Sequence, residues 1–391
     1  ALMPMQAAQM KKTICYSFSV AVVAFLFVAP ATFAVGNSIS FSPSVNLSND
    51  AYNARYPMVA NSGNNVYVVW TEQSHGIYYR HSPDGGVTWI PSLNQSATRL
   101  NSRGGVAGYP VITANGTHVY IAWTQTINSI SQVYFRASTD SGNSFSLPQV
   151  IDLNSTLSAI TPVLAGWGSN VYFAWAAGAK SFERSSNNSG VSWSPVNNLG
   201  SGHEPQLATS GLYAYFVSDG NSYAYTSDNG STWHKVNLQI AHGSEPWIAA
   251  SGSKVYVAWE QKKLNKTAPI YGVISNDYGL TFNGSEVLSG SVINDWEPQI
   301  AASGNSVYLT FRSLSPPSAW VTSSNNSGAS WRTPLQLSSP NHPTGWPLDV
   351  VVSGNNVFTI YGSATTPGGS IWNAYASYSA DGGNTWTSRP G

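Results

Sequence analysis

The feature that most constrains what this chain can fold into is an eight-residue pattern that occurs seven times. Its form is Ser/Thr-x-Asp/Asn-x-Gly-x-Ser/Thr-aromatic, and its first copy runs from Ser82 to Trp89. The acidic or amide position is held by Asp84, Asp140, Asn188, Asp228, Asp277, Asn326 and Asp381. These copies follow one another at intervals of 40 to 56 residues. At such a period, each repeat is expected to form one supersecondary unit of a larger array.

The octet has the composition of a tight turn between two strands. The Asp or Asn side chain is expected to bond backbone N–H groups two residues further on, and the glycine to adopt a positive φ. The aromatic residue is expected to begin the next strand and pack into the sheet. No copy has more than one carboxylate in its acidic position, and Asn188 and Asn326 provide none there. We therefore interpret the octets as structural turns and not as calcium or catalytic sites.

A second repeat precedes each octet and consists of two β runs joined by a Gly/Asn turn. The first copy reads Tyr56-Pro-Met-Val-Ala, followed after the turn by Val66-Tyr-Val-Val-Trp70. One further strand leads into each octet and another follows it. Each unit thus provides four strands in about fifty residues, which is the size of one propeller blade.

These repeats predict an all-β fold, a seven-bladed β-propeller of four-stranded antiparallel blades. Only five residues follow Trp386, whereas the segment Ile39–Leu47 has the pattern of a fourth strand without a preceding octet. Pairing these two ends would close the ring and remove exposed strand edges. We expect a single propeller domain over residues 35–391, closed by its N-terminal strand.

The octets resemble the Asp-box (BNR) repeats of the sialidase-like β-propeller superfamily. They extend over essentially the whole chain after the N-terminal apolar segment. The motif is specific for this fold but carries little information about function, because sialidases, other glycosidases, sorting receptors and assembly factors share it.

The resemblance implies what a sialidase of this fold would need. It would have an arginine cluster for the substrate carboxylate, a Tyr nucleophile with a Glu partner, and an Asp acid/base. Arg55, before Tyr56-Pro57, and Glu72 match positions of this set, and Arg312 follows a second strand from which it could reach the ligand. The loop 73–76 lacks the expected Asp and the Arg that accompanies it. Three other arginines share one slot before the octet and are interpreted as part of the repeat: Arg80, Arg136 and Arg184.

Charged residues are only 9% of the chain, and they concentrate in connections that should share one face of a propeller. Glu204, Glu245 and Glu297 occupy one position in three consecutive repeats, at the start of the innermost strand, and are expected to form an acidic arc at the channel mouth. The further ligand-face candidates are His203, His242, Asp295, Trp247, Trp296 and Trp346. Two interpretations stay open for the glutamates: they bind backbone N–H groups of the next blade, or they form a site for a sugar or a divalent cation. The tryptophans either stack on sugars or fill the core.

The N-terminus has the three-part pattern of a secretory signal within residues 1–34. Lys11 and Lys12 precede the apolar segment 14–29, and small residues follow it at 29–34. A retained anchor helix is the alternative. Cys15 is the only cysteine and lies in this segment, so no disulfide or thiolate chemistry is expected after cleavage. Sequons that predict glycosylation in a suitable host begin at Asn46, Asn94, Asn115, Asn154, Asn187, Asn229, Asn265, Asn283 and Asn325.

Lysine and arginine together number 17, as do aspartate and glutamate, which argues against nucleic acid as a partner. We expect a secreted or cell-surface monomer without a cofactor in its fold, which binds a glycan or a surface protein and is not an enzyme. The alternatives are an exo-acting sialidase-like glycoside hydrolase and a propeller that binds a divalent cation at the channel mouth.

Overall fold

The structure is a computed structural model that describes residues 46–48, 54–72, 76–102, 104–152, 159–219, 222–238, 243–261, 269–292, 295–338, 344–364 and 372–386. These residues form strands, bridges and turns, and none of them is helical. They therefore include no helix long and apolar enough to cross a membrane. The predicted export signal and Cys15 lie outside the described residues.

Seven antiparallel sheets follow one another along the chain, and neighbouring strands in each sheet are consecutive in sequence. Blades 1 and 2 are β1 (Ala54–Ser62), β2 (Asn65–Glu72), β3 (Gly76–Ser82), β4 (Thr98–Arg99) and β5 (Val106–Asn115), β6 (His118–Ile127), β7 (Ile130–Ser138), β8 (Gln149–Val150). Blades 3 and 4 are β9 (Ala159–Trp167), β10 (Asn170–Ala177), β11 (Lys180–Ser186), β12 (Asn197–Ser201) and β13 (Gln206–Ser210), β14 (Tyr213–Ser218), β15 (Ser222–Thr226), β16 (His234–Val236).

The remaining three blades follow the same plan. Blades 5 and 6 are β17 (Gly243–Ser251), β18 (Lys254–Gln261), β19 (Ile270–Ser275), β20 (Glu286–Val287) and β21 (Asp295–Ser303), β22 (Ser306–Leu314), β23 (Pro317–Ser324), β24 (Leu335–Gln336). Blade 7 has three described strands, β25 (Thr344–Ser353), β26 (Asn356–Ala364) and β27 (Trp372–Ser379). The fourth strands are shorter than expected, with only two paired residues in blades 1, 2, 5 and 6.

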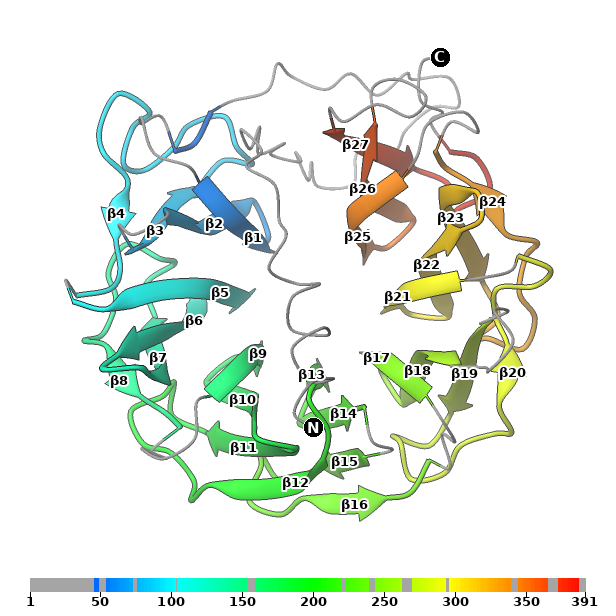
Figure 1. The fold of residues 1–391 in the computed structure, drawn as a ribbon, viewed down its shortest axis with the longest axis horizontal. Coiled ribbons are helices and arrows are strands. Elements are labelled where there is room, and N and C mark those ends of the chain that lie inside the picture. The colour runs from blue at the N-terminus through cyan, green and yellow to red at the C-terminus, as the bar shows by residue number, and fades with distance from the viewer. Residues whose placement is uncertain are drawn as a thin grey trace, which may run out of the picture.

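The blades form a ring with the first strand of each blade innermost (Figure 1). This arrangement confirms the predicted seven-bladed β-propeller. The core lies between neighbouring blades, where large side chains such as Trp123 and Trp175 are almost completely buried. Residues 39–45 and 387–391 lie outside the described part of the chain, so closure by the N-terminal strand remains a prediction.

The octets are turns, as predicted, but their hydrogen bonds reach further along the chain than expected. In the second copy, Asp140 Oδ1 accepts hydrogen bonds from Ser144 N–H at 2.9 Å and from Ser138 Oγ at 2.6 Å. The carboxylate therefore bonds the N–H four residues on and not two residues on. The hydroxyl of Ser138 in turn accepts the N–H of Gly142 at 2.9 Å, which closes the turn from the other side.

The aromatic residue that ends each octet packs against the preceding blade, so it joins two blades and does not simply begin a strand. Phe145 meets Tyr79 of blade 1 edge to face at 5.0 Å, and Trp193 meets Phe135 of blade 2 at 4.9 Å. Such edge-to-face pairs add stability beyond the area that they bury. The octets are thus the sites at which consecutive blades are held together.

The arginines Arg80, Arg136 and Arg184 are structural, as expected, because their guanidinium groups bind backbone carbonyls between blades. Each donates to the carbonyl of a buried apolar residue near the end of a preceding outer segment: Arg136 to Leu100 O at 2.8 Å and Arg184 to Ile151 O at 3.2 Å. Arg80 donates in the same way to Leu47 O at 2.7 Å. Leu47 therefore takes, at blade 1, the place that the end of a fourth strand takes at blades 2 and 3.

Candidate functional site

A backbone bulge lies near the start of the innermost strands, at the end of the ring where the channel mouth was predicted. In β1 the pairing with β2 shifts between Arg55 and Met58, so that Tyr56 and Pro57 are passed over. Proline has no N–H to contribute to the ladder, which is why the pairing breaks at this point. The bulges lie at the same end of the blades as the β2–β3 connections, and the octets lie at the opposite end.

The residue before the proline adopts an unusual conformation. It has a positive φ in five blades: Tyr56 at 51°, Tyr109 at 52°, Thr161 at 47°, Glu245 at 50° and Glu297 at 58°. Residues other than glycine rarely enter this region, and such strain persists only where the surrounding structure enforces it. Strained backbone of this kind clusters at functional sites, and here it marks one ring of positions around the channel mouth.

Blades 1 to 3 supply aromatic and hydroxyl groups to this ring of positions. The rings of Tyr56 and Tyr109 meet across the junction of their blades with centroids 4.6 Å apart, and Tyr109 is 45% exposed. Thr161 Oγ1 donates to the backbone oxygen of His203 at 2.8 Å and so links blade 3 to blade 4. The tyrosine pair was not among the predicted ligand-face residues, although the repeated Tyr-Pro dipeptide at Tyr56 and Tyr109 is a signal for it.

Of the three predicted glutamates in blades 4 to 6, two occupy equivalent positions in the structure. Glu245 and Glu297 share the left-handed conformation and are partly buried. Glu204 departs from the predicted equivalence, because it precedes β13 and is not among the residues with positive φ. There the carboxylate of Asp219 accepts the N–H of Glu204 at 3.0 Å and that of His203 as well, which holds the chain in a different turn.

A second layer of side chains supports the bulges from the neighbouring strand. In blades 4 to 6 the residue after the second-strand position of Trp70 is charged: Asp219, Glu260 and Arg312. Arg312 Nη2 pairs with Glu297 Oε1 at 3.3 Å, with both side chains about one-seventh exposed. In blade 2 the corresponding Thr124 hydroxyl donates to Gly108 O at 3.0 Å. Arg312 therefore occupies a position whose side chains contact the bulge, and its guanidinium group is paired with the Glu297 carboxylate.

Asp295 is completely buried two residues before Glu297. Burial raises the pKa of its carboxyl to about 7, because the charged form is disfavoured away from water and the nearby Ser289 hydroxyl offsets this only in part. The carboxyl of Asp295 is therefore partly protonated near neutral pH.

Arg55 and Glu72 lie near each other at the start of blade 1, but Glu72 has a structural partner. Its Oε1 accepts the indole N–H of Trp70 at 3.1 Å, and Gln125 and Gln261 accept those of Trp123 and Trp259 at 3.3 Å in the same way. Glu72 is 1% exposed. The acidic residue that matched the sialidase pattern is therefore one copy of a repeated Trp-x-Glu/Gln contact.

The remaining predicted ligand-face residues, His242 and the three tryptophans, do not form one cluster among the described side chains. Trp247 packs into the core between blades 5 and 6, which favours its role as a core residue, and Trp296 is partly buried opposite Arg312. His242 lies outside the described residues, and for Trp346 the structure describes only its backbone within β25. Among the described side chains, no three His, Cys, Asp or Glu residues gather in a way that could hold a metal ion.

No protein-family model matches this sequence, and no curated protein does. Among solved structures, an ulvan lyase of a polysaccharide lyase family matches with a TM-score of 0.51 and 8% identity, over 82% of this chain and 93% of that chain. An α-L-arabinofuranosidase from Fusarium graminearum has a TM-score of 0.49 and 11% identity, over 84% and 94% of the two chains. A sialidase from Trypanosoma rangeli has a TM-score of 0.43 and 12% identity, over 73% and 56%. At these identities the likeness is one of fold alone, and the ulvan lyase match supports it.

Proposed function

We propose that this protein binds carbohydrate at the mouth of its channel and does not hydrolyse it. The observation that carries the proposal is the composition of the strained ring of positions before the prolines. One side of the ring presents the adjacent, mutually tilted rings of Tyr56 and Tyr109 and the hydroxyl of Thr161, and the other presents Glu245 and Glu297. Aromatic faces pack against the apolar faces of sugar rings, and carboxylates accept hydrogen bonds from their hydroxyls.

The distribution of the arginines supports binding over sialidase chemistry. A carboxylate-binding cluster needs several guanidinium groups at one place. In the described residues, Arg80, Arg136 and Arg184 are engaged with backbone carbonyls between the blades. At the mouth this leaves Arg55 and Arg312, the latter paired with Glu297. The proposed ligand is accordingly a glycan without a required carboxylate.

Binding of neutral oligosaccharides, measured by isothermal titration calorimetry, tests this function. Tyr109→Ala should weaken binding by about fivefold, because one aromatic contact contributes roughly 1 kcal/mol. The matched control is Tyr278→Ala, since Tyr278 is 40% exposed and stacks on Tyr213 at 4.6 Å on the octet side. Equal loss of binding in both variants, or no binding by the native protein, contradicts the proposal.

The second candidate is an exo-acting sialidase-like glycoside hydrolase, and two features of β21 favour it: the raised pKa of Asp295 and, two residues further on, the pairing of Glu297 with Arg312. A general acid that is still protonated near pH 7 is one of the two carboxyl groups such an enzyme requires. Turnover of fluorogenic glycosides, including a sialoside, distinguishes the candidates. If the native protein turns over a glycoside and Arg55→Ala or Asp295→Asn abolishes this turnover, the protein is a hydrolase and the binding proposal is wrong.

We also propose that the chain is exported through cleavage after the apolar segment 14–29, and that a divalent cation at the mouth is not required. Intact-mass analysis of the secreted protein checks the first point, because a mass that includes residues 10–31 means a retained anchor. Thermal melting with calcium, zinc and EDTA checks the second. A midpoint that depends on the cation in the native protein, but not in Glu245→Gln, means that the mouth binds metal.

A further inference from the structure

The arginine position between blades has a regular set of partners. In blade 2, Arg136 Nε donates to Ser146 O at 2.5 Å, Nη1 to Leu100 O at 2.8 Å and Nη2 to Phe145 O at 3.2 Å. Leu100 ends the outer strand of the preceding blade, and the other two residues close the octet of the same blade. Arg184 has the equivalent three partners in blade 3. A guanidinium group thus fills a pocket lined by three backbone carbonyls.

Blade 5 has a valine at this position. Val273 pairs with Val257 on β18 as Arg136 pairs with Ile121 on β6. A valine side chain has no N–H to donate, so it cannot bind the carbonyls that the arginine binds.

The three carbonyls themselves are retained around Val273. Phe282 and Asn283 close the octet of blade 5, and Asn283 N–H donates to Ile274 O at 2.9 Å as Ser146 N–H does to Ala137 O. The third carbonyl belongs to Leu238, in the outer segment of blade 4. Its place follows from the strand register. Val236 pairs with Tyr223 as Thr98 pairs with Tyr79, so two residues further on Leu238 corresponds to Leu100.

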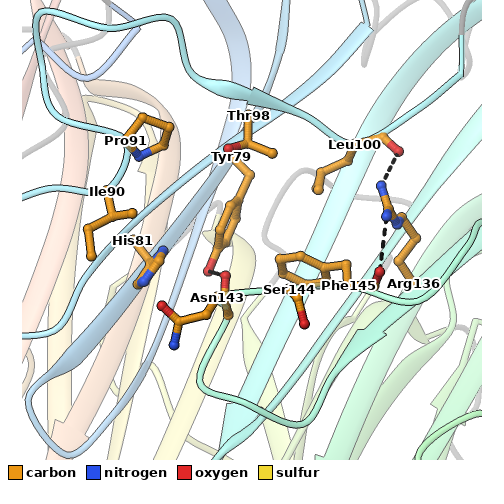
Figure 2. A pocket seen from close by; sticks show the side chains of 11 residues that line it. Tyr79, His81, Ile90, Pro91, Thr98, Leu100, Arg136, Asn143, Ser144 and Phe145 are labelled. Atoms are coloured by element: carbon orange, nitrogen blue, oxygen red, sulfur yellow. Dashed lines mark hydrogen bonds between the residues drawn. The ribbon is translucent and has the colours of Figure 1, made fainter.

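The structure has a cavity where the arginine is missing. The cavity at blades 4 and 5 measures about 470 Å³ and is lined by Leu238, Val273, Phe282 and Asn283, among others. The cavity at the corresponding place between blades 1 and 2, which Arg136 partly fills, measures about 140 Å³ (Figure 2). In Figure 2 the Arg136 side chain reaches Leu100 and the backbone beside Phe145.

Other blades without an arginine close the same place by other means. In blade 6, Thr322 Oγ1 donates to Arg332 O at 2.6 Å, which is the counterpart of Ser146 O. In blade 4, Ala224 is completely buried in a cluster with Leu199 and Phe216. In blade 5, Val273 is also buried, at 3% exposure, and a cavity of about 470 Å³ lies beside it, lined by the counterparts of the residues whose carbonyls bind Arg136 in blade 2.

We infer that this cavity, here named the arginine socket (Leu238, Val273, Phe282 and Asn283), binds a guanidinium group from outside the chain, presented by an arginine side chain of a peptide or protein partner. A planar guanidinium has five N–H donors in a fork, which matches three carbonyls better than a compact ammonium group does. The local charge is favourable as well. Thr281 lines the cavity, and its hydroxyl donates to Asp277, whose pKa is lowered to about 2 by such hydrogen bonds and which is therefore ionised.

The first test fills the socket from within. Val273→Arg should restore the three contacts of Arg136 and raise the melting temperature by about 2 °C or more, since bonds to charged groups are the stronger ones. Val273→Leu is the control for added apolar volume. A melting temperature of Val273→Arg at or below that of Val273→Leu overturns the inference, because the carbonyls would then not accept a guanidinium group.

The second test uses the native full chain and three probes in thermal melting: N-acetylarginine amide, its neutral isostere N-acetylcitrulline amide, and N-acetyllysine amide. The arginine probe should raise the midpoint of the native protein more than the other two, and should raise that of Val273→Arg no more than they do. General effects of guanidinium on stability act on both proteins and cancel in this comparison. Equal responses of the native protein and Val273→Arg overturn the inference.

The reverse variant gives a test that does not depend on blade 5. Arg136→Val should lower the melting temperature by opening a second socket between blades 1 and 2, and the arginine probe should recover part of the loss. If the probe recovers nothing while citrulline acts equally, the carbonyl set has no preference for guanidinium and the inference falls. The socket lies on the octet side, so none of these outcomes bears on carbohydrate binding at the channel mouth.

Discussion

At the scale of the residue, Glu183 has a carboxyl group at a position where the equivalent residues of blades 1 and 2 have aromatic rings. It lies on β11 opposite Ala174, in the position that Tyr79 and Phe135 occupy in blades 1 and 2, and it is 1% exposed. Burial raises its pKa to about 8, and the hydroxyl of Ser185 and the indole N–H of Trp233 offset this only in part. Glu183 is therefore protonated in the folded protein at pH 7 and ionised in the unfolded chain.

This difference predicts a pH dependence of stability. Between about pH 4.5 and 8 the folded state binds one proton more than the unfolded state, so the free energy of unfolding falls as the pH rises through this window. Glu183→Gln cannot ionise and should leave stability nearly unchanged at pH 4, while raising the melting temperature at pH 8. Melting curves from pH 4 to 9 check this. A parallel shift at every pH would show that the carboxyl does not titrate in this range.

The octet carboxylates have the opposite behaviour, because they are hydrogen-bonded at the surface. The pKa of Asp140 is lowered to about 2 by bonds from Ser138 and Ser144, although partial burial opposes the shift. Two octets have Asn at this position, and Asn188 Oδ1 still accepts Ser192 N–H at 2.9 Å. The amide thus reproduces the essential contact.

We predict that Asp140→Asn is tolerated and that Asp140→Ala is not. The alanine variant loses the acceptor of Ser144 N–H and Ser138 Oγ, which should lower the free energy of unfolding by about 1–3 kcal/mol. The asparagine variant should lose less than about 1 kcal/mol. Urea denaturation of the three proteins measures both values. Similar losses in the two variants would mean that the charge, and not the acceptor geometry, holds the turn.

At the scale of the element, two constraints require glycine in an octet such as that of Gly142. One is the positive φ of the turn, and the other is the close approach of a side chain from the neighbouring blade. Gly142 has φ of 81°, and a Cβ added there would lie 2.0 Å from the hydroxyl oxygen of Tyr79. Gly63, in the turn between β1 and β2, has φ of 58° with no atom within 4 Å of such a Cβ.

The two glycines form a matched pair. Gly63→Ala should cost about 1–2 kcal/mol, the strain of a left-handed alanine. Gly142→Ala should cost a further 1–3 kcal/mol or so, because the methyl group would displace Tyr79 and open the junction of blades 1 and 2. Chemical denaturation gives both values. Equal costs would show that the junction accommodates the methyl group.

At the scale of the whole molecule, the described contacts join each blade to the next through octets and arginines, and Leu47 continues this series at blade 1. Leu47 is 1% exposed and packs against Val68 and Trp89, while its carbonyl accepts from Arg80. These contacts are those that the end of an outer strand makes in other blades. They support the prediction that the N-terminal segment completes blade 7.

Removal of residues 38–48 should therefore destabilise the ring or cause self-association, because it exposes a strand edge and leaves the Arg80 guanidinium without Leu47 O. Light scattering with size-exclusion chromatography and melting curves measure the two effects. Removal of residues 35–37 alone is the control and should change neither. A shortened protein that stays monomeric with an unchanged midpoint would refute closure by this segment.

The sequence by itself determined the repeat and hence the fold, because the chemistry of the octets is local. A Ser/Thr-x-Asp/Asn-x-Gly turn closes with its own side chains, and alternating β runs on either side leave few arrangements other than blades. The structural role of Arg80, Arg136 and Arg184 was also predictable, since three residues in one repeated slot serve the repeat. The equivalent positions of Glu245 and Glu297 near the starts of innermost strands were predictable as well, whereas Glu204 precedes its strand.

The tertiary structure decided what these positions do, because the decisive contacts join residues some fifty positions apart. The left-handed conformation of Tyr56 and Tyr109 and the meeting of their rings depend on two blades lying side by side. The arginine socket arises from Val273, which in sequence is one more apolar residue of a strand. Its significance comes from the three carbonyls that two blades hold around it, and no local pattern encodes such a meeting.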